Sequence, residues 1–418
     1  MDVSLNAGVS KQQHILGGSG ENVLLYLGRY LARDRSSGSH VSLDVNHPHA
    51  ILIAGKRGYG KSYTMGVLME GLMLLPDGIK DGVSSVVIDT MGIYWTLVRS
   101  NEMQEHTIQG WGLETRGFDI DVFVPSGSLG SYEERNINVK PLSIPISQLD
   151  GHEWCKLFGI DTVSPPGVLI IRMIRELQKK HTFSFDDIID HLIEDERSET
   201  VTKGAVENHF MGAASWGVFE GAGTCVEEFV KGGTTSVIDV STIKSEAVRS
   251  AVVSSIARSI YQLRLEARRS YERLMMGDKD VDRGIPMVWL FIDEAQQFLP
   301  SDSKTLASDI LLNECLKQGR QPGLSLVLAT QRPSSIHPDV LSQSDIVICH
   351  RLSSQDDISV LESVRPTYMK DNFADSIMKM GSERGIAFIV DDTTEASHII
   401  RMRPRLSWHG GNDPGIIP

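Results

Sequence analysis

Residues 51–62 read ILIAGKRGYGKS, and this stretch decides the fold of the chain. It matches the pattern G-x-x-x-x-G-K-[ST], in which a glycine-rich turn joins a buried strand to a helix. The apolar run 50–54 predicts the strand, and apolar residues at helical spacing within 61–75 predict the helix. Glycines let backbone N–H groups turn inward around phosphate oxygens, and the start of the helix adds positive charge. The stretch therefore predicts a phosphate-binding loop.

Two side chains of this loop carry the expected chemistry. We expect the Lys61 ammonium to reach the β- and γ-phosphates of ATP, and the Ser62 hydroxyl to ligate Mg²⁺. A glycine-rich turn with a chance lysine is the alternative, but the strand and helix on either side argue against it. The other residues expected to contact the nucleotide are Gly55, Arg57, Gly58, Tyr59, Gly60 and Tyr63.

A second apolar strand, predicted over 287–292, ends in two carboxylates. Asp293 is placed to hold the Mg²⁺ shell, and Glu294 to polarise the attacking water as a general base. Successive side chains of a strand point to opposite sides, so the pair would divide these two tasks. The alternative is that both residues only cap a helix that begins at Ala295. With the phosphate-binding loop upstream, the pair favours nucleotide hydrolysis.

A third apolar strand, predicted over 324–329, also ends in polar residues. Gln331 follows the end of this strand, where it is placed to contact the γ-phosphate or the attacking water. Alternatively, Thr330 and Gln331 only begin a loop, and Arg332 is a surface charge.

Three arginines are candidates for contact with the nucleotide of a neighbouring subunit. Arg320 lies in the rigid loop 319–323 and suits an arginine finger, which stabilises charge on a transferring phosphoryl group. Equally, it is a favourable charge at the end of a helix predicted over 304–319. Arg401 and Arg403 alternate with a methionine in a strand-like run, where they either contact that nucleotide or form interface ion pairs.

Strand and helix patterns alternate along most of the chain. Near-continuous apolar strands separated by helices predict an α/β fold with a mostly parallel sheet covered on both faces. The core strands are predicted at 50–54, 85–88, 119–124, 235–240, 287–292, 324–329, 346–350 and 386–390.

Four regions follow from these patterns. Residues 1–47 are expected to form a short N-terminal attachment, weakly ordered up to residue 20 and hairpin-like beyond it. The core occupies 48–143 and 231–410, and 411–418 form a tail. An inserted helical subdomain occupies 144–230. The helices expected in the insert lie at 151–159, 167–180, 184–194 and 202–220, and a long core helix is expected at 245–275.

Composition limits the classes of partner and the compartment. The formal net charge of −13 argues against a protein coated in basic residues for duplex DNA, but it allows a basic channel inside an acidic ring. Four cysteines lie far apart and without metal-ligand spacing, which is typical of a reducing cytoplasm. No stretch approaches 18 apolar residues, so we expect no signal peptide and no membrane span.

Taken together, the motifs resemble the HerA/FtsK superfamily, and most closely its HerA-type branch, with a shortened N-terminal region. The resemblance covers roughly residues 48–410. The stretches that carry it are 293–295, 319–320, 329–334, Pro338, 341–343, the set Asp89, Gly92 and Tyr94, and the C-terminal 401–403 and 409–411.

The resemblance implies a homohexameric ring of RecA-like ATPase cores with nucleotide sites between subunits. It implies Arg320 as a finger acting in trans and Gln331 as a sensor. The activity typical of that family is ATP-driven movement of duplex DNA through the ring, for a partner nuclease or an antiviral effector. Two alternatives remain at this stage. One is an ATP-dependent ring scaffold that activates an effector without translocation, and the other is a protein pump, which would need a membrane anchor.

Overall fold

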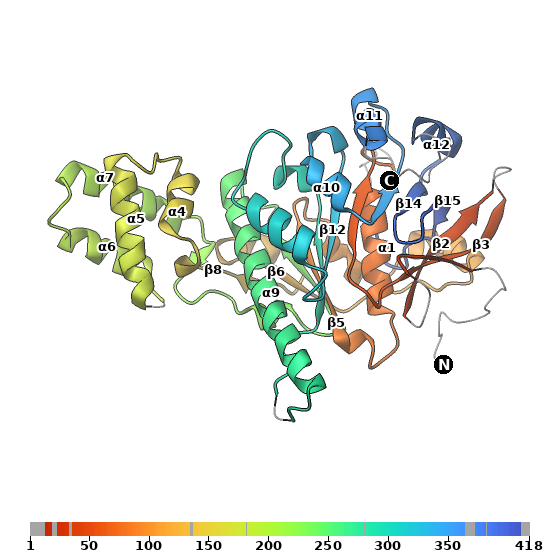
Figure 1. The fold of residues 1–418 in the computed structure, drawn as a ribbon, viewed down its shortest axis with the longest axis horizontal. Helices are drawn as coiled ribbons and strands as arrows, with labels where there is room; N and C mark the ends of the chain where they lie inside the picture. Colours follow the sequence, from red (N-terminus) through yellow and green to blue (C-terminus); the bar gives the residue numbers. More distant parts are fainter. Residues whose placement is uncertain are drawn as a thin grey trace.

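The computed structural model describes residues 13–18, 23–32, 36–133, 137–180, 182–279, 281–363, 373–381 and 383–410 (Figure 1). The predicted C-terminal tail and most of the N-terminal stretch that was expected to be weakly ordered lie outside these ranges. Within that stretch, Gln13–Leu16 form strand β1, so the expectation of weak order is wrong for these four residues.

Among the described residues, thirteen strands form one sheet in the order β1-β3-β2-β15-β14-β13-β4-β12-β11-β5-β10-β6-β7. The strands from β13 to β7 in this order are parallel, which confirms the predicted mostly parallel α/β sheet. These strands are β4 (Ala50–Ala54), β5 (Val83–Asp89), β6 (Ile120–Pro125), β7 (Lys140–Leu142), β10 (Thr235–Asp239), β11 (Met287–Ile292), β12 (Leu324–Thr330) and β13 (Ile346–Cys349).

A mostly antiparallel wing continues the sheet beyond β13, with β1 added to it in parallel to β3. The hairpin expected near the N-terminus is present as β2 and β3. Strand β2 also pairs with β15, with Arg29 opposite Arg401 in the backbone register. The N-terminal hairpin, which sequence patterns suggested as a short attachment, is part of the main sheet. The wing strands with β1 are β2 (Leu24–Leu31), β3 (Ser37–Asp44), β14 (Ile386–Asp391) and β15 (Ala396–Met402).

Two apolar clusters cover the two faces of the sheet, because alternate residues of each strand point to opposite sides. Ile51 and Ile53 of β4 pack in the cluster that includes α1 (Lys61–Met73). Leu52, between them, packs in the cluster that includes α9 (Glu246–Met275). The helix expected over 304–319 differs from a regular α-helix, because Ile310–Leu316 are π-helical.

The inserted helices lie together beyond one end of the sheet (Figure 1). Strand β8 (Ile144–Pro145) pairs with β9 (Phe219–Glu220) and closes the base of this insert. The last helix was expected to reach residue 220, but it ends at Ala214 and the chain turns into β9. The helices are α4 (Gly151–Phe158), α5 (Pro165–Leu177), α6 (Phe185–Glu194) and α7 (Thr200–Ala214).

The insert packs around a buried tryptophan, continues the apolar cluster that includes α9, and has a polar connection to that helix. Trp154 is fully buried and packs against Phe158, Phe210 and Phe219. Arg258 of α9 donates to Glu153 of α4 at 2.6 Å, which joins the two helices at their contact. Other helices of the structure are α2 (Glu105–Gly110), α3 (Gly130–Glu133), α8 (Val226–Phe229), α10 (Pro338–Gln343), α11 (Gln355–Ser363) and α12 (Phe373–Met380). In the described ranges, no helix combines the length and apolar character needed to cross a bilayer.

Candidate nucleotide site

The predicted phosphate-binding loop connects the carboxyl end of β4 to the start of α1. Gly58 has φ 79° and Gly60 has φ 120°, backbone conformations that residues with a Cβ rarely adopt. A Cβ on Gly55 would lie 2.7 Å from the Cβ of His350, so this glycine permits close packing beneath the loop. The glycines of the motif are therefore required by the shape of the loop and by its support.

His350, which follows β13, supports the loop from below. It is fully buried, and its Nδ1–H donates to the Ile386 carbonyl at 2.9 Å, since that oxygen can only accept. Its Nε2 then accepts from Thr64 Oγ1 at 2.8 Å. Burial and the nearby Lys61 charge lower the pKa of His350 to about 4, so the imidazole is neutral near pH 7. Sequence reasoning missed this residue, whose only signal was its place after a strand adjacent to β4.

Lys61 and Ser62 begin α1, next to the end of β11. The Lys61 side chain is only 5% exposed, and burial lowers its pKa while the Glu294 and Asp293 carboxylates act in the opposite direction. Ser62 Oγ donates to Asp293 Oδ2 at 3.3 Å. The structure thus brings together the two residues expected to hold Mg²⁺, although 231 positions separate them in the chain.

Asp293 is fully buried, and burial followed by the nearby Glu294 raises its pKa. Its Oδ2 accepts a hydrogen bond from the Tyr94 hydroxyl at 3.0 Å, in addition to the bond from Ser62. A hydroxyl and a carboxylate converging on one point are the hard oxygen ligands that Mg²⁺ prefers, so these residues fit the expected ion. Tyr94 was noted in sequence only as part of a family motif, and its contact with Asp293 was not foreseen.

Asp89, at the end of β5, has a structural part in placing Tyr94. Its two carboxylate oxygens accept four backbone N–H groups, from residues 91 to 94, at 2.7–3.0 Å. These bonds fold the chain sharply after the strand and direct Tyr94 under the site. Burial and the neighbouring Asp239 raise the pKa of Asp89 to about 7, while the backbone donors oppose the shift.

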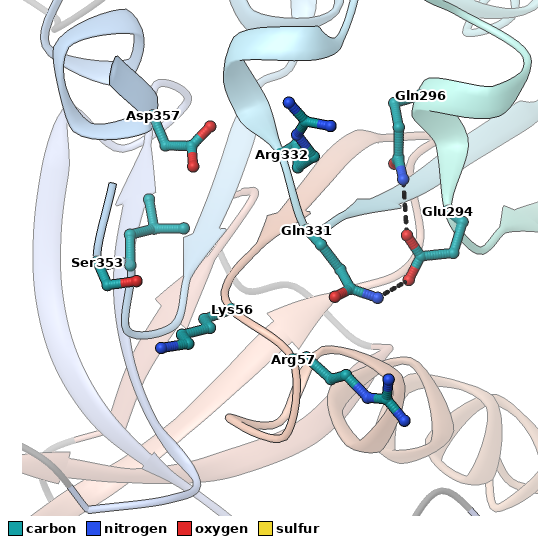
Figure 2. A pocket seen from close by; sticks show the side chains of 9 residues that line it. Lys56, Arg57, Glu294, Gln296, Gln331, Arg332, Ser353 and Asp357 are labelled. Carbon is teal, nitrogen blue, oxygen red and sulfur yellow. Dashed lines mark hydrogen bonds between the residues drawn. The ribbon is translucent and has the colours of Figure 1, made fainter. Parts of the chain in front are cut away.

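Glu294 stands at the edge of a cavity of about 440 Å³ beside the loop (Figure 2). Its backbone is left-handed, with φ 49°, an uncommon conformation that is often found at functional sites. Gln331 Nε2 donates to Glu294 Oε1, and Gln296 Nε2 donates to Glu294 Oε2 at 2.7 Å. No side-chain cap joins Glu294 to the 3₁₀ turn Ala295–Gln297, so capping does not explain this carboxylate.

Basic side chains line the same cavity. Figure 2 shows Lys56, Arg57 and Arg332 around it, together with Gln331 and Glu294. Cations at such a position suit a ligand that carries several negative charges. Gln331 lies beside Glu294 at this cavity, and its contact with the γ-phosphate or the attacking water stays a prediction.

The two aromatic residues predicted to contact nucleotide make other contacts in the free subunit. The Tyr59 ring lies under the Arg351 guanidinium, with 5.7 Å from Cζ to the ring centroid. The Tyr63 hydroxyl accepts from the Arg405 backbone N–H at 2.6 Å, and its ring packs edge-on to His409. Tyr63 therefore belongs to the contact between α1 and the C-terminal segment, and a role with nucleotide remains a prediction for both residues.

Arg320 lies at the opposite edge of the sheet from the phosphate-binding loop. It precedes the seven-residue strand β12, while Thr330 at the other end of β12 neighbours the loop. At roughly 3.3 Å per residue, about 20 Å of strand separate the two edges. The half-exposed guanidinium pairs with Asp345 at 3.2 Å, which in turn accepts from His49. Arg320 cannot serve the nucleotide of its own subunit, and its action on a neighbour remains a prediction.

The structure corrects the prediction for Arg403. This side chain is 1% exposed, and its guanidinium donates to Glu70 Oε2 at 2.8 Å and to the carbonyls of Val67 and Tyr26. These bonds hold the guanidinium inside its own subunit, so contact with a nucleotide was a wrong expectation. Arg401 of β15 is partly exposed and pairs with Glu383 at 2.6 Å, so contact with a neighbouring nucleotide or an interface ion pair remains a prediction.

Comparisons with known proteins agree with this geometry. The probable DNA double-strand break repair helicase HerA of Methanocaldococcus jannaschii is 29% identical over 130 residues, which are 31% of this chain and 25% of that protein. The DNA double-strand break repair helicase HerA of Sulfurisphaera tokodaii is 27% identical over 199 residues, 47% of this chain and 37% of that protein. The chain thus matches well under half the length of these curated relatives.

A solved structure and a family description complete the comparison. VirB4 of Thermoanaerobacter pseudethanolicus superposes with a TM-score of 0.60 at 16% identity, covering 93% of this chain and 98% of that one. This likeness confirms the predicted RecA-like P-loop ATPase fold. The family model described as "Helicase HerA, central domain" matches residues 25–260, which are more than half of the chain. On that match, and on the motif geometry that accompanies it, the chain belongs to the helicase HerA central-domain family.

Proposed function

We propose that this chain is an ATPase motor that hydrolyses ATP at the loop between β4 and α1. The observation that carries the proposal is the placement of Glu294, held by two amide groups at the cavity beside the phosphate-binding loop. A carboxylate has about four lone-pair sites, and two amide donors leave others available to a water molecule. A fixed carboxylate next to a phosphate-binding loop is the arrangement that hydrolysis needs and that nucleotide binding alone does not.

Each side chain has a defined part in this reaction. Lys61 and the loop N–H groups bind the phosphates, while Ser62 and Asp293 would hold Mg²⁺, which neutralises charge on them. Glu294 orients the attacking water and accepts its proton. Gln331 contacts the γ-phosphate or the water. It does so by giving up its hydrogen bond to Glu294 or by keeping that bond while making the new one. Arg320 of a second copy would add a cation from the neighbouring subunit.

The finer proposal concerns assembly and substrate. We assign a cytoplasmic homohexamer that moves duplex DNA for a partner nuclease or effector protein. Family membership supports it, as do the curated relatives, which are named as helicases of double-strand break repair. The position of Arg320 on the opposite edge of the sheet also supports sites shared between subunits. A ring scaffold that assembles without translocation is the competing function.

Duplex DNA is expected to raise the ATPase rate of the wild-type protein. A motor that contacts 6–10 phosphates loses about 10³–10⁵-fold in DNA affinity between 50 and 200 mM salt, so the stimulation should disappear over this range at limiting DNA. The measurement is steady-state ATP hydrolysis with and without duplex DNA at several salt concentrations. ATP-dependent assembly with an unstimulated rate at low salt would reject the motor and favour the scaffold.

Mixing two inactive variants is expected to restore hydrolysis if Arg320 acts on a neighbour. Lys61→Ala removes the phosphate contact and Arg320→Ala removes the finger, but in mixed rings some sites receive Lys61 from one subunit and Arg320 from the next. Random mixing in equal amounts makes about one quarter of the sites complete in a cyclic assembly. The rate of ATP hydrolysis at several mixing ratios measures this recovery.

The matched control is a mixture of Lys61→Ala and Glu294→Gln. Both residues lie on the same side of the site within one subunit, so no mixture completes a site and no recovery is expected. Absence of recovery for Arg320→Ala at every ratio would argue against sites shared between subunits.

A further inference from the structure

Gln296 lies two residues after Glu294, in the 3₁₀ turn Ala295–Gln297. Its Nε2 donates to Glu294 Oε2 at 2.7 Å, and its Oε1 accepts from Thr330 Oγ1 at 2.8 Å (Figure 2 shows the first of these bonds). Thr330 is fully buried at the end of β12, immediately before Gln331. A single amide thus joins the ends of two neighbouring strands, β11 and β12, through the carboxylate proposed as the base.

The groups at the two ends of this series of hydrogen bonds determine the direction of each bond in it. The Arg332 backbone N–H, which can only donate, donates to Thr330 Oγ1 at 3.1 Å. The Thr330 hydroxyl proton is then available for Gln296 Oε1, which turns the amide NH₂ group toward Glu294. An ionised carboxylate can only accept, so this orientation satisfies the Glu294 oxygen. The opposite orientation of the amide would place two acceptors, Gln296 Oε1 and Glu294 Oε2, against each other.

We infer that Gln296 is a positioning residue for the hydrolysis proposed above, with Thr330 fixing the direction of its amide. The inference rests on the proposed role of Glu294. Glu294 leaves the strand in a left-handed conformation, so its carboxylate is directed by side-chain hydrogen bonds from Gln296 and Gln331. When Gln331 turns to the nucleotide, Gln296 retains the other oxygen and keeps the carboxylate aimed into the cavity.

The arrangement also couples the proposed base, Glu294, to the end of strand β12. Thr330 and Gln331 are consecutive residues. Gln331 forms a hydrogen bond with Glu294 directly, and Thr330 is connected to it by two hydrogen bonds through Gln296. A displacement of the end of β12 on nucleotide binding therefore moves both amides that hold the carboxylate. This gives the chain a direct route from γ-phosphate contact to orientation of the base.

The test measures kcat and KM for ATP, with duplex DNA present. Gln296→Leu keeps the size of the side chain but cannot donate, and we expect kcat to fall about tenfold, as for loss of one hydrogen bond to a charged group, with KM unchanged within about twofold. Thr330→Val should lower kcat in the same way, and Thr330→Ser, which keeps the hydroxyl, should restore most of that loss. Because the two residues act in series, the double variant Gln296→Leu with Thr330→Val should be no slower than Gln296→Leu alone.

Gln297 offers a matched control in the same turn. Its Oε1 accepts from Arg249 at 3.0 Å on α9, away from the cavity, so Gln297→Leu should keep the wild-type kcat. A merely structural role for Gln296 would lower the thermal midpoint or weaken ADP binding along with the rate, and that result overturns the inference. So does a Gln296→Leu rate within twofold of a measurable wild-type rate. A wild-type protein without any ATPase activity would instead remove the proposed function itself.

Discussion

Replacing Glu294 by glutamine is expected to lower ATP turnover by at least about 100-fold, the lower range for loss of a general base. The substitution keeps the shape of the side chain and removes its capacity to accept a proton. It also adds an NH₂ group where Gln296 and Gln331 both present donors, so one of these contacts must be lost or the Gln331 amide must turn its oxygen toward it. Nucleotide affinity should persist, because Lys61, Ser62 and Asp293 are untouched.

Single-turnover hydrolysis and the affinity for ATP are the measurements that separate chemistry from binding. Glu227→Gln on the exposed face of α8 makes the same chemical change far from the site in sequence and outside its cavity, and should keep the wild-type rate. A Glu294→Gln protein that retained more than half of the wild-type turnover would remove Glu294 as the base. It would also remove the reason for assigning Gln296 a part in the reaction.

Replacing Arg403 by methionine is expected to destabilise the protein by about 3–5 kcal/mol, the usual cost of breaking a buried ion pair by removing one partner. Glu70 of α1 is fully buried and accepts from Arg403, from Arg405 and from Ser407. Without Arg403 the carboxylate loses one of its two cations, and the carbonyls of Val67 and Tyr26 lose their donor. The free energy of unfolding in urea at pH 7 measures the effect.

Arg401→Met is the matched control, two residues before Arg403 and on strand β15, which ends at Met402. The ion pair of Arg401 with Glu383 is partly exposed, so its loss should cost at most about 1 kcal/mol. Equal losses for the two variants would contradict the difference in burial. Because Glu70 lies on the helix that begins with Lys61, the Arg403 variant should also weaken ATP binding, whereas the Arg401 variant should bind ATP like the wild type.

The pH dependence of this effect follows from the pKa of Glu70. Burial raises that pKa, but the charges of Arg403 and Arg405 and the hydrogen bonds to the carboxylate outweigh it, so the pKa lies below its ordinary value of 4.5. A carboxyl group whose pKa is lowered by folding stabilises the protein above its unfolded value, and this contribution is lost as the pH falls. The difference in stability between wild type and Arg403→Met should therefore be full near pH 7 and shrink below pH 4.5.

Much of the candidate nucleotide site could be predicted from sequence because its residues belong to contiguous patterns. The glycine-rich loop, the strand ending in Asp293 and Glu294, and the strand ending before Gln331 each combine a local backbone signal with a polar side chain. In a parallel sheet, the carboxyl ends of neighbouring strands meet at one edge, so the order of elements was enough to bring these residues together. The same periodicity placed the core strands within about two residues of their observed bounds, while the ends of α5 and α7 differed more.

The sequence by itself determined the phosphate-binding loop, the α/β class and the residues expected to perform chemistry. Only the tertiary structure decided which side chains support them: Tyr94 under Asp293, His350 under the loop, and Gln296 between Glu294 and Thr330. It also decided that Arg403 serves Glu70 inside the subunit. The physical reason is that hydrogen-bond partners 199 or 333 positions apart leave no periodic trace in the chain, and burial becomes known only when the elements pack.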